Sequence, residues 1–326
     1  LKGRKPFITT GLLAYFLVSI AYILSRNVNF FIAIRFFQGI GSAMILPVAQ
    51  AYVGEITPKH KEGFAMGLFN VSLYGGLSVG PLVGGMLNDS LGIQFSFLGM
   101  GADSLSGFLL CLIFLPPRAH ERIRTAAKPP LRYIVLIRNK YVCALFLFRL
   151  AYTACIGLVW AFLPLYAHER FKLSSSAIGV LGMLGVLTSG LLQTPMGFLA
   201  DRFNKRALIA IGGLVTAGAV FSLAYVQGFW GLFLGNIGFG IGGGIAVPAV
   251  MAMTVIIGRH TDSMGSVMAI LTMGHSLGML MGPILAGIMA DAFQLGLVFI
   301  GGTVVMVIGV AVSLLLTSGF QAWAEK

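Results

Sequence analysis

The sequence predicts an all-α integral membrane protein. Hydrophobic residues make up 57% of the 326 residues and charged residues only 10%, whereas soluble domains carry about 25% charged residues. The apolar residues gather in long runs, and these runs lack the period-two alternation of a membrane barrel. Each run is therefore predicted to cross the membrane as a helix.

About ten such runs follow one another, each long enough to cross about 30 Å of hydrocarbon. Short loops that carry most of the basic residues separate them. In chain order the predicted spans are Phe7–Leu24, Phe30–Val53, Phe64–Leu87, Phe95–Leu115, Tyr141–Tyr166, Ala177–Ala200, Ala207–Val226, Trp230–Ile257, Met264–Ala290 and Gly296–Leu316.

The basic residues predict the orientation of these spans. Of the 22 Lys and Arg residues, Arg35 and Arg149 lie inside spans, and one set of alternate loops holds only Arg26, Arg170 and Lys172. The other set of loops holds the remaining Lys and Arg residues. Because an excess of Lys and Arg marks the cytoplasmic side, this second set is predicted to lie in the cytoplasm. We expect a multi-pass protein of the plasma (inner) membrane with both chain ends in the cytoplasm. Nucleic acid is not an expected partner, because the cations are not gathered on one polar face.

The longest loop, Pro116–Lys140, is basic and contains several prolines. It predicts a cytoplasmic linker over residues 117–140, between a first half at residues 1–116 and a second half at residues 141–326. A solvated connector is one interpretation of such a sequence. Contact with anionic lipid headgroups is the other.

A glycine stripe organises the third span. Gly76, Gly80 and Gly84 recur every four residues and so share one helix face, where they would let a neighbouring backbone approach closely. Pro81, in the same helix, removes a backbone donor and bends the axis. We therefore expect a bent and tightly packed helix.

The same pattern returns late in the chain. Residues 63–89 align without a gap on residues 265–291, so that Gly282 and Pro283 match Gly80 and Pro81 (283 − 81 = 202). An internal repeat in a membrane protein indicates a transporter.

Two charged residues lie inside the first four spans. Burying the Arg35 guanidinium costs about 2.5–3.5 kcal/mol on insertion scales. We therefore expect it to face a cavity or a partner, with Gln38 on the same helix face; snorkelling to the outer headgroups is the alternative. Asp103, in the middle of the fourth span, is expected to be protonated or paired, or else to be a neutral group bonded to a neighbouring helix.

Polar and aromatic side chains also mark the later spans. Tyr152 and Trp160 share a helix face with Arg149, and they either line a cavity or face lipid and other helices. Arg149 itself is expected to snorkel inward. Pro164 is predicted to break this helix near its outer end.

Asn236 and His275 complete the set of cavity candidates. Asn236 begins a glycine-rich stretch of the eighth span. His275 lies in the penultimate span, where it either titrates or is packed and hydrogen-bonded.

The sixth span ends in the stretch Gly197–Arg206, which reads GFLADRFNKR. Asp201 lies there at the membrane boundary, with Arg202 and Arg206 beside it. A carboxylate next to a cation cluster forms a salt bridge or caps a neighbouring helix. The sequence has no HExxH motif and no cluster of metal ligands in one span, so we expect neither metal nor cofactor, and a membrane enzyme is disfavoured.

Three of these stretches resemble signature motifs of the major facilitator superfamily. Gly197–Arg206 resembles its motif A, Arg35–Ala43 (RFFQGIGSA) its motif B, and Gly76–Gly85 (GLSVGPLVGG) its motif C, which is associated with antiporters of the twelve-helix drug:proton branch. The resemblance implies two six-helix halves around a central cavity that opens alternately to each side. The predicted spans then correspond to the third through twelfth helices, and we expect an N-terminally truncated chain that lacks the first two.

The resemblance also implies roles for individual residues. The arginine of motif B, here Arg35, takes part in proton coupling. Asp103 belongs to none of these motifs, and its place in the middle of a span makes it a second candidate for that role. The aspartate of motif A, here Asp201, gates the cytoplasmic side, with Arg202 and Arg206 beside it. The residues of motif C that pack the halves together and seal an exporter are Gly76, Gly80, Pro81, Gly84 and Gly85, to which the repeat adds Gly282 and Pro283.

These inferences predict a secondary active transporter that exports drugs or similar small molecules in exchange for protons. The expected partners are a small-molecule substrate, protons and the lipid bilayer, and we expect a monomer. An importer or metabolite carrier of the same superfamily is the alternative, as is a non-transporting fragment.

The orientation is testable at Thr125 in the predicted linker. In a variant without the native cysteines, a Thr125→Cys thiol should resist membrane-impermeant thiol reagents on intact cells and react once the membrane is permeabilised. Rapid labelling from outside would overturn the orientation.

Overall fold

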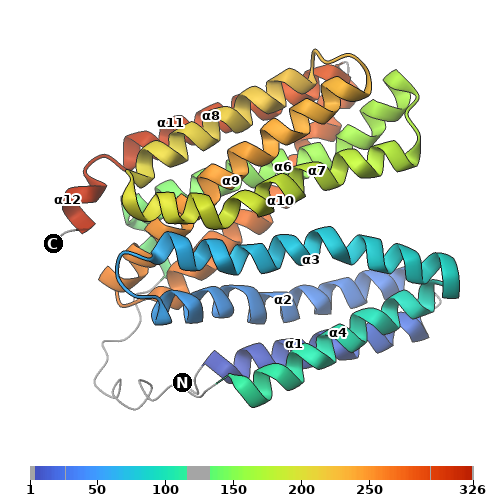
Figure 1. Ribbon diagram of the computed structural model, residues 1–326, viewed down its shortest axis with the longest axis horizontal. Helices are drawn as coiled ribbons and strands as arrows, with labels where there is room; N and C mark the ends of the chain where they lie inside the picture. The colour runs from blue at the N-terminus through green and yellow to red at the C-terminus, as the bar shows by residue number, and fades with distance from the viewer. Residues whose placement is uncertain (1–3, 26, 116–132, 294, 325–326) are drawn as a thin grey trace. The chain divides into compact units, whose positions relative to one another are not determined.

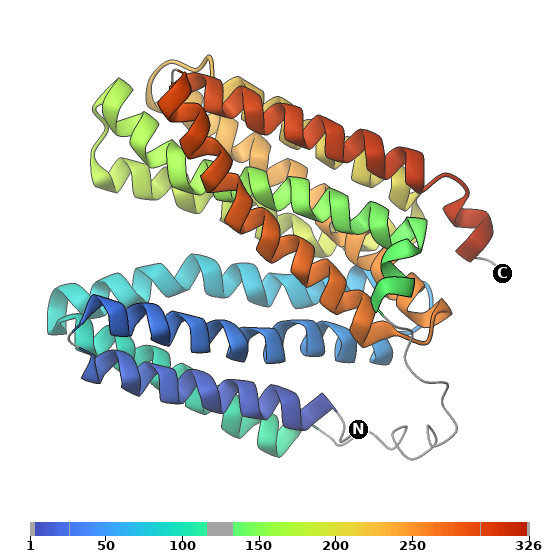
Figure 2. The ribbon, with the colours of Figure 1, turned by 180° about the vertical axis from the view of Figure 1, so that it is seen from behind.

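The computed structural model describes residues 4–25, 27–115, 133–293 and 295–324, and the regular structure in these residues is helical (Figure 1, Figure 2). In chain order the helices are α1 (Arg4–Leu24), α2 (Val28–Ile56), α3 (Glu62–Leu91), α4 (Ile93–Phe114), α5 (Tyr133–Arg138), α6 (Lys140–Phe171), α7 (Ser175–Arg202), α8 (Lys205–Leu223), α9 (Gly228–His260), α10 (Met264–Ala292), α11 (Leu295–Leu316) and α12 (Phe320–Ala324).

The predicted fold class is confirmed. Every predicted span coincides with a helix, and within the described residues nine helices are long and apolar enough to cross a membrane. Polar caps set several of the helix starts. The side chain of Asn139 accepts a hydrogen bond from the Tyr141 amide at 2.9 Å before α6, and Asn204 accepts one from the Arg206 amide at 3.0 Å before α8. The chain is therefore a multi-pass membrane protein.

Contacts between residues divide the chain into two units. The first unit contains residues 1–52 and 77–130, and the second contains residues 53–76 and 131–326. The end of α2 and the first half of α3 therefore belong to the same unit as α5 to α12.

The first unit has an aromatic core between α1, α2 and α4. The Tyr22 ring stacks on Phe97 with ring centroids 4.9 Å apart, and Val18 and Ile34 are buried with Tyr22. The Ser19 hydroxyl donates a hydrogen bond to the Phe97 carbonyl oxygen. Packing and this hydrogen bond together join α1 to α4.

The second unit is built around α9, which is rich in glycine and largely buried. Helices α7 and α8 pack on α9, while α10 and α11 pack on α6. A Cβ on Gly212 of α8 would lie 2.6 Å from the Gly242 carbonyl oxygen of α9, so the two helices touch through their backbones. Near the end of the chain the Trp323 ring of α12 lies 5.0 Å from Tyr141 and 4.8 Å from His260, measured between ring centroids.

Two local predictions are wrong. Pro164 does not break its helix, because α6 continues to Phe171; neighbouring groups in a membrane protein compensate for the missing donor. The loop predicted before Lys140 contains the short helix α5, which buries Leu136. Residues 116–132 of the predicted linker lie outside the described residues.

The two copies of the glycine repeat have different surroundings. In the second copy, a Cβ on Gly282 would collide with the Ala154 carbonyl oxygen of α6, and Pro283 lies against Gly157. In the first copy, a Cβ on Gly76, Gly80 or Gly84 would meet nothing within 4 Å among the described residues. The backbone neighbour predicted for this stripe is thus not found there, and its packing role stays a prediction. The surroundings of Pro81 and Gly85 in α3 lie outside the described residues.

Adding one methyl group should test the contact between α6 and α10. In Gly278→Ala, the new Cβ would lie 2.9 Å from the Ala154 nitrogen and collide with the Leu150 carbonyl oxygen. Overpacking of this kind costs about 1–3 kcal/mol, so the thermal midpoint of the purified protein should fall by several degrees.

The matched control is Gly218→Ala in α8, where a Cβ would meet nothing within 4 Å among the described residues. Alanine is the better helix former by up to about 1 kcal/mol, so this variant should be unchanged or more stable. Equal midpoints for the two variants would show that α6 and α10 are not in backbone contact.

Candidate functional site

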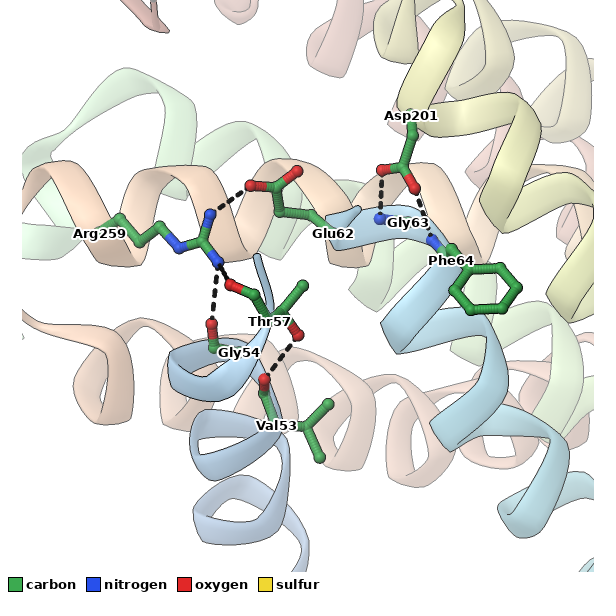
Figure 3. A network of polar contacts seen from close by, with 8 residues as sticks. All are labelled: Val53, Gly54, Thr57, Glu62, Gly63, Phe64, Asp201 and Arg259. Carbon is green, nitrogen blue, oxygen red and sulfur yellow. Dashed lines mark hydrogen bonds and ion pairs between the residues drawn. The ribbon is translucent and has the colours of Figure 1, made fainter. Parts of the chain in front are cut away.

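The carboxylate of Asp201 binds the start of α3 (Figure 3). Its Oδ1 accepts a hydrogen bond from the Gly63 amide at 2.6 Å, and its Oδ2 accepts one from the Phe64 amide at 2.9 Å. The first amides of a helix have no partner within the helix, and the helix dipole places partial positive charge there. The carboxylate therefore joins the end of α7 to the start of α3.

Arg259, near the end of α9, joins two more helix ends. Its Nη1 pairs with the Glu62 carboxylate in the first turn of α3, and its Nη2 donates to the carbonyl oxygens of Gly54, at 3.3 Å, and Thr57 (Figure 3). The side chain of Glu62 is only 6% exposed and that of Arg259 24% exposed, so the pair is largely shielded from water. An acid in a first helical turn and a cation on the last carbonyls both complement helix dipoles.

These contacts form one group, which we call the helix-end network. It ties together the ends of α2, α3, α7 and α9, all within the second unit. Its members are Gly54, Thr57, Glu62, Gly63, Phe64, Asp201 and Arg259.

Glycines let α3 and α7 approach closely enough for the network to form. A Cβ on Gly197 would collide with the Gly63 carbonyl oxygen and lie 2.8 Å from its carbonyl carbon. One turn further, a Cβ on Gly67 would lie 3.0 Å from the Gln193 carbonyl carbon. Because these contacts are backbone against backbone, a side chain at Gly63 or Gly197 would push the helices apart and withdraw Asp201 from α3.

A pocket of about 870 Å³ opens beside the network, and its charged lining is mostly basic. Arg202 lies over the Phe198 ring at 4.1 Å, and Arg206 Nη2 donates to the Leu314 carbonyl oxygen at 2.6 Å. Among the described contacts neither arginine forms an ion pair with Asp201. Of the two alternatives left open by the sequence, the structure shows the cap on a neighbouring helix.

Chemically, the network consists of reversible polar contacts. Two carboxylates, one guanidinium and backbone groups form its bonds, and water can replace each of them as a partner. Within the described residues, no group of three His, Cys, Asp or Glu gathers to hold a metal ion.

In the first unit the structure brings Arg35 and Gln38 together. Arg35 Nη1 donates to Gln38 Oε1 at 3.1 Å, and the Tyr22 hydroxyl donates to the same oxygen at 3.2 Å. The guanidinium also lies 5.6 Å from the centre of the Tyr22 ring. Asp103 is exposed, and in the described part of the chain no ion pair joins it to Arg35.

The remaining cavity candidates differ in exposure, and their role stays a prediction. Tyr152 and Asn236 are buried, with exposed fractions of 2% and 3%, whereas Trp160 is 44% exposed. His275 is half-buried. The Nη1 atom of Arg149 is buried, so the inward snorkelling predicted for this residue is wrong.

Sequence reasoning missed Glu62, Arg259 and Tyr22 as contact residues. An acid in the first turn of a predicted helix, within a basic loop, is a signal that could have singled out Glu62. No sequence spacing could have paired it with Arg259, because the two lie 197 residues apart. Tyr22 gave no signal, because a tyrosine in an apolar span is common.

Comparisons with known proteins agree with this architecture. A family model described as Major Facilitator Superfamily matches residues 2–186 and, in a second match, residues 145–326. An uncharacterized MFS-type transporter of Methanocaldococcus jannaschii is 26% identical over 293 residues, which cover 89% of this chain and 75% of the relative. The multidrug resistance protein MdtG of Salmonella dublin is 24% identical over 307 residues, which cover 91% of this chain and 74% of the relative.

Solved structures share the fold. The crystal structure of the human organic anion transporter MFSD10 gives a TM-score of 0.79 at 19% identity, over 95% of this chain and 77% of that chain. The structure of the E. coli fucose:proton symporter FucP gives a TM-score of 0.74 at 16% identity, over 95% and 83%. At these identities the likeness shows the fold alone.

Removing one carboxylate should test the helix-end network. Asp201→Ala leaves two amides of α3 without their acceptors, and hydrogen bonds to charged groups contribute about 1.5–3 kcal/mol. The thermal midpoint of the purified protein should therefore fall by several degrees. Asp291→Ala is the matched control, because Asp291 also lies in the last turn of a helix but is exposed. Equal midpoints for the two variants would mean that the Asp201 bonds add nothing to stability.

Proposed function

The chain belongs to the major facilitator superfamily, and we propose that it is a secondary active transporter that exports drugs or similar small molecules in exchange for protons. We place it in the inner (plasma) membrane, with both chain ends and the linker in the cytoplasm, because of the distribution of Lys and Arg.

The helix-end network is the observation that carries this proposal. Its bonds hold four helix ends through one carboxylate and one ion pair. The contacts are non-covalent and exchangeable with water, so the same groups hold these ends together in one state and release them in another. An alternating-access transporter needs such a reversible closure, and we assign it to the cytoplasmic side with Asp201 at its centre.

The export direction rests on Gly76–Gly85, which resembles the motif of antiporters. The relative MdtG is a multidrug resistance protein by name, and we carry that substrate class over as part of the proposal. In the exporting protein, Gly76, Gly80 and Gly84 would receive a neighbouring helix backbone and close the path from the outside.

For proton coupling we propose Arg35. Its contacts with Gln38 and Tyr22 hold a positive charge at a fixed place in α2. We propose that this fixed charge acts on a group that takes up and releases the proton, and Asp103 is our candidate for that group. Each proton that crosses a membrane potential of 100 mV supplies about 2.3 kcal/mol to drive export.

Inside-out membrane vesicles that contain the full-length protein test both transport and coupling. Acidifying the vesicle lumen should drive the accumulation of a fluorescent drug, and a protonophore should abolish it. Arg35→Ala should reduce proton-driven accumulation about tenfold or more while changing drug binding much less, since one pKa unit in a coupled group corresponds to a tenfold change. Arg35→Lys should restore part of the activity, because it keeps the charge and loses the planar fork.

Three results would contradict parts of this proposal. Proton-driven loss of substrate from the same vesicles would indicate an importer. Accumulation that persists with the protonophore would remove proton coupling. Equal losses of drug binding and coupling in Arg35→Ala would make Arg35 a ligand contact or a structural residue.

A further inference from the structure

Arg149 places a positive charge deep in the membrane. It lies about 13 Å along α6 from Lys140, at 1.5 Å per residue, and so far from the expected headgroup region. Its Nη1 atom is buried and has no hydrogen-bond partner among the described residues, although the side chain as a whole is only half-buried. A guanidinium at this depth is costly and is expected to face a partner or a water-filled space.

His275 of α10 lies beside this guanidinium. It is about 16 Å along α10 from Met264, and Arg149 acts on it electrostatically. The close crossing of α6 and α10 brings them together: Thr153 Oγ1 donates to the Gly274 carbonyl oxygen at 3.4 Å, just before His275. The Nδ1 atom of His275 is also buried without a hydrogen-bond partner among the described residues.

The surroundings of Arg149 provide hydroxyl groups and no carboxylate. The groups that interact with it electrostatically are Tyr74 of α3 and Tyr152 and His275 of the neighbouring turns. Within the described residues, no carboxylate is among the groups that act on Arg149. Glu62 and Asp201 lie in the helix-end network, and Asp291 ends α10.

A satisfied chain of hydrogen bonds fixes the groups behind Arg149. The Tyr152 hydroxyl is hydrogen-bonded to Tyr74 and Ser189. Gln193 Nε2 donates to Ser189 Oγ at 3.3 Å, and Asn70 Nδ2 donates to Gln193 Oε1 at 3.0 Å. A fully connected buried network of this kind is rigid. Arg149 Nη1 and His275 Nδ1 are not part of this chain of hydrogen bonds and stay without a partner among the described residues.

We propose that Arg149 and His275 form a binding site for the anionic group of an organic acid, a carboxylate or a sulfonate, at mid-depth in the membrane. The planar guanidinium presents paired donors that match the two oxygens of such a group, and His275 Nδ1 donates a third hydrogen bond when it carries the proton. That this anion is cargo rests on the proposed transport function, whereas the binding site itself does not. A lipid phosphate does not fit, because headgroups lie at the membrane surface and the site lies about 13 Å from it.

Matched ligands test the charge requirement without relying on transport. The full-length protein in detergent is titrated with 2-naphthoate, with 2-naphthalenesulfonate and with the uncharged methyl ester of naphthoate, and binding is measured from the rise in thermal midpoint. The two acids should stabilise the protein and the ester should not, because the three ligands share the ring system and differ in charge.

Variants then test whether Arg149 and His275 bind the acids. Arg149→Gln should weaken acid binding about tenfold or more, the usual effect of losing a hydrogen bond to a charged group. Arg149→Lys should lose less, because it keeps the charge. His275→Ala should also weaken acid binding about tenfold or more, because the lost hydrogen bond goes to a charged group. Arg138→Gln is the matched control, because Arg138 is an exposed arginine at the end of α5. It should bind as the unmodified protein does.

Several results would contradict the proposed anion site. The proposal fails if neither acid binds the unmodified protein, if the ester binds as tightly as the acids, or if Arg149→Gln binds them unchanged. It also fails if Arg149→Gln loses only proton dependence, which would make Arg149 a coupling residue. If Arg149→Gln does not fold, Arg149→Lys and His275→Ala decide the question. Acid binding that depends on Arg149, without transport of any substrate, would overturn the proposed function and leave the anion site standing.

Discussion

The bond between the Asp201 carboxylate and two backbone amides is the interaction on which the ends of four helices depend. It requires a charge in the last turn of α7, free amides at the first turn of α3, and no side chain at Gly63 or Gly197. If the helices were separated by one methyl group, the carboxylate would lose its amides, and Glu62 in the same turn would move away from Arg259. Backbone contact and charge pairing are therefore one cooperative arrangement, because the glycines set the distance at which the charges act.

The sequence predicted the parts of this arrangement and not their assembly. Hydropathy located the helices, because each must satisfy its own backbone in lipid. The sequence also placed Asp201 at a membrane boundary and left open whether it forms a salt bridge or caps a neighbouring helix. It could not indicate that Glu62 pairs with Arg259, because a contact across 197 residues depends on how helices cross. In the same way, Pro164 has the same local chemistry whether a helix ends or continues, and only the packing around α6 decides between them.

The glycine repeat is a second case in which the sequence predicts a helix surface and not the helix that packs on it. Spacing predicts that Gly76, Gly80 and Gly84 share a face, and equally that Gly278 and Gly282 do. Only the second pair lies against a backbone, that of α6, among the described residues. A small-residue stripe indicates that a helix is able to accept a close neighbour. The stripe does not indicate which helix packs there, because that depends on the sequence of another segment of the chain.

Charge in the second unit follows two different rules according to depth. At the helix ends, Asp201, Glu62 and Arg259 are matched by backbone dipoles and by one another, so folding alone satisfies them. At mid-membrane, Arg149 and His275 keep buried polar atoms without a partner in the described chain. A protein that needed Arg149 only for stability would gain by replacing it with an apolar side chain, because an unmatched charge in hydrocarbon opposes folding. We therefore attribute the charge of Arg149 to the anion that we propose binds there from solution, whereas the charges at the helix ends are matched within the chain.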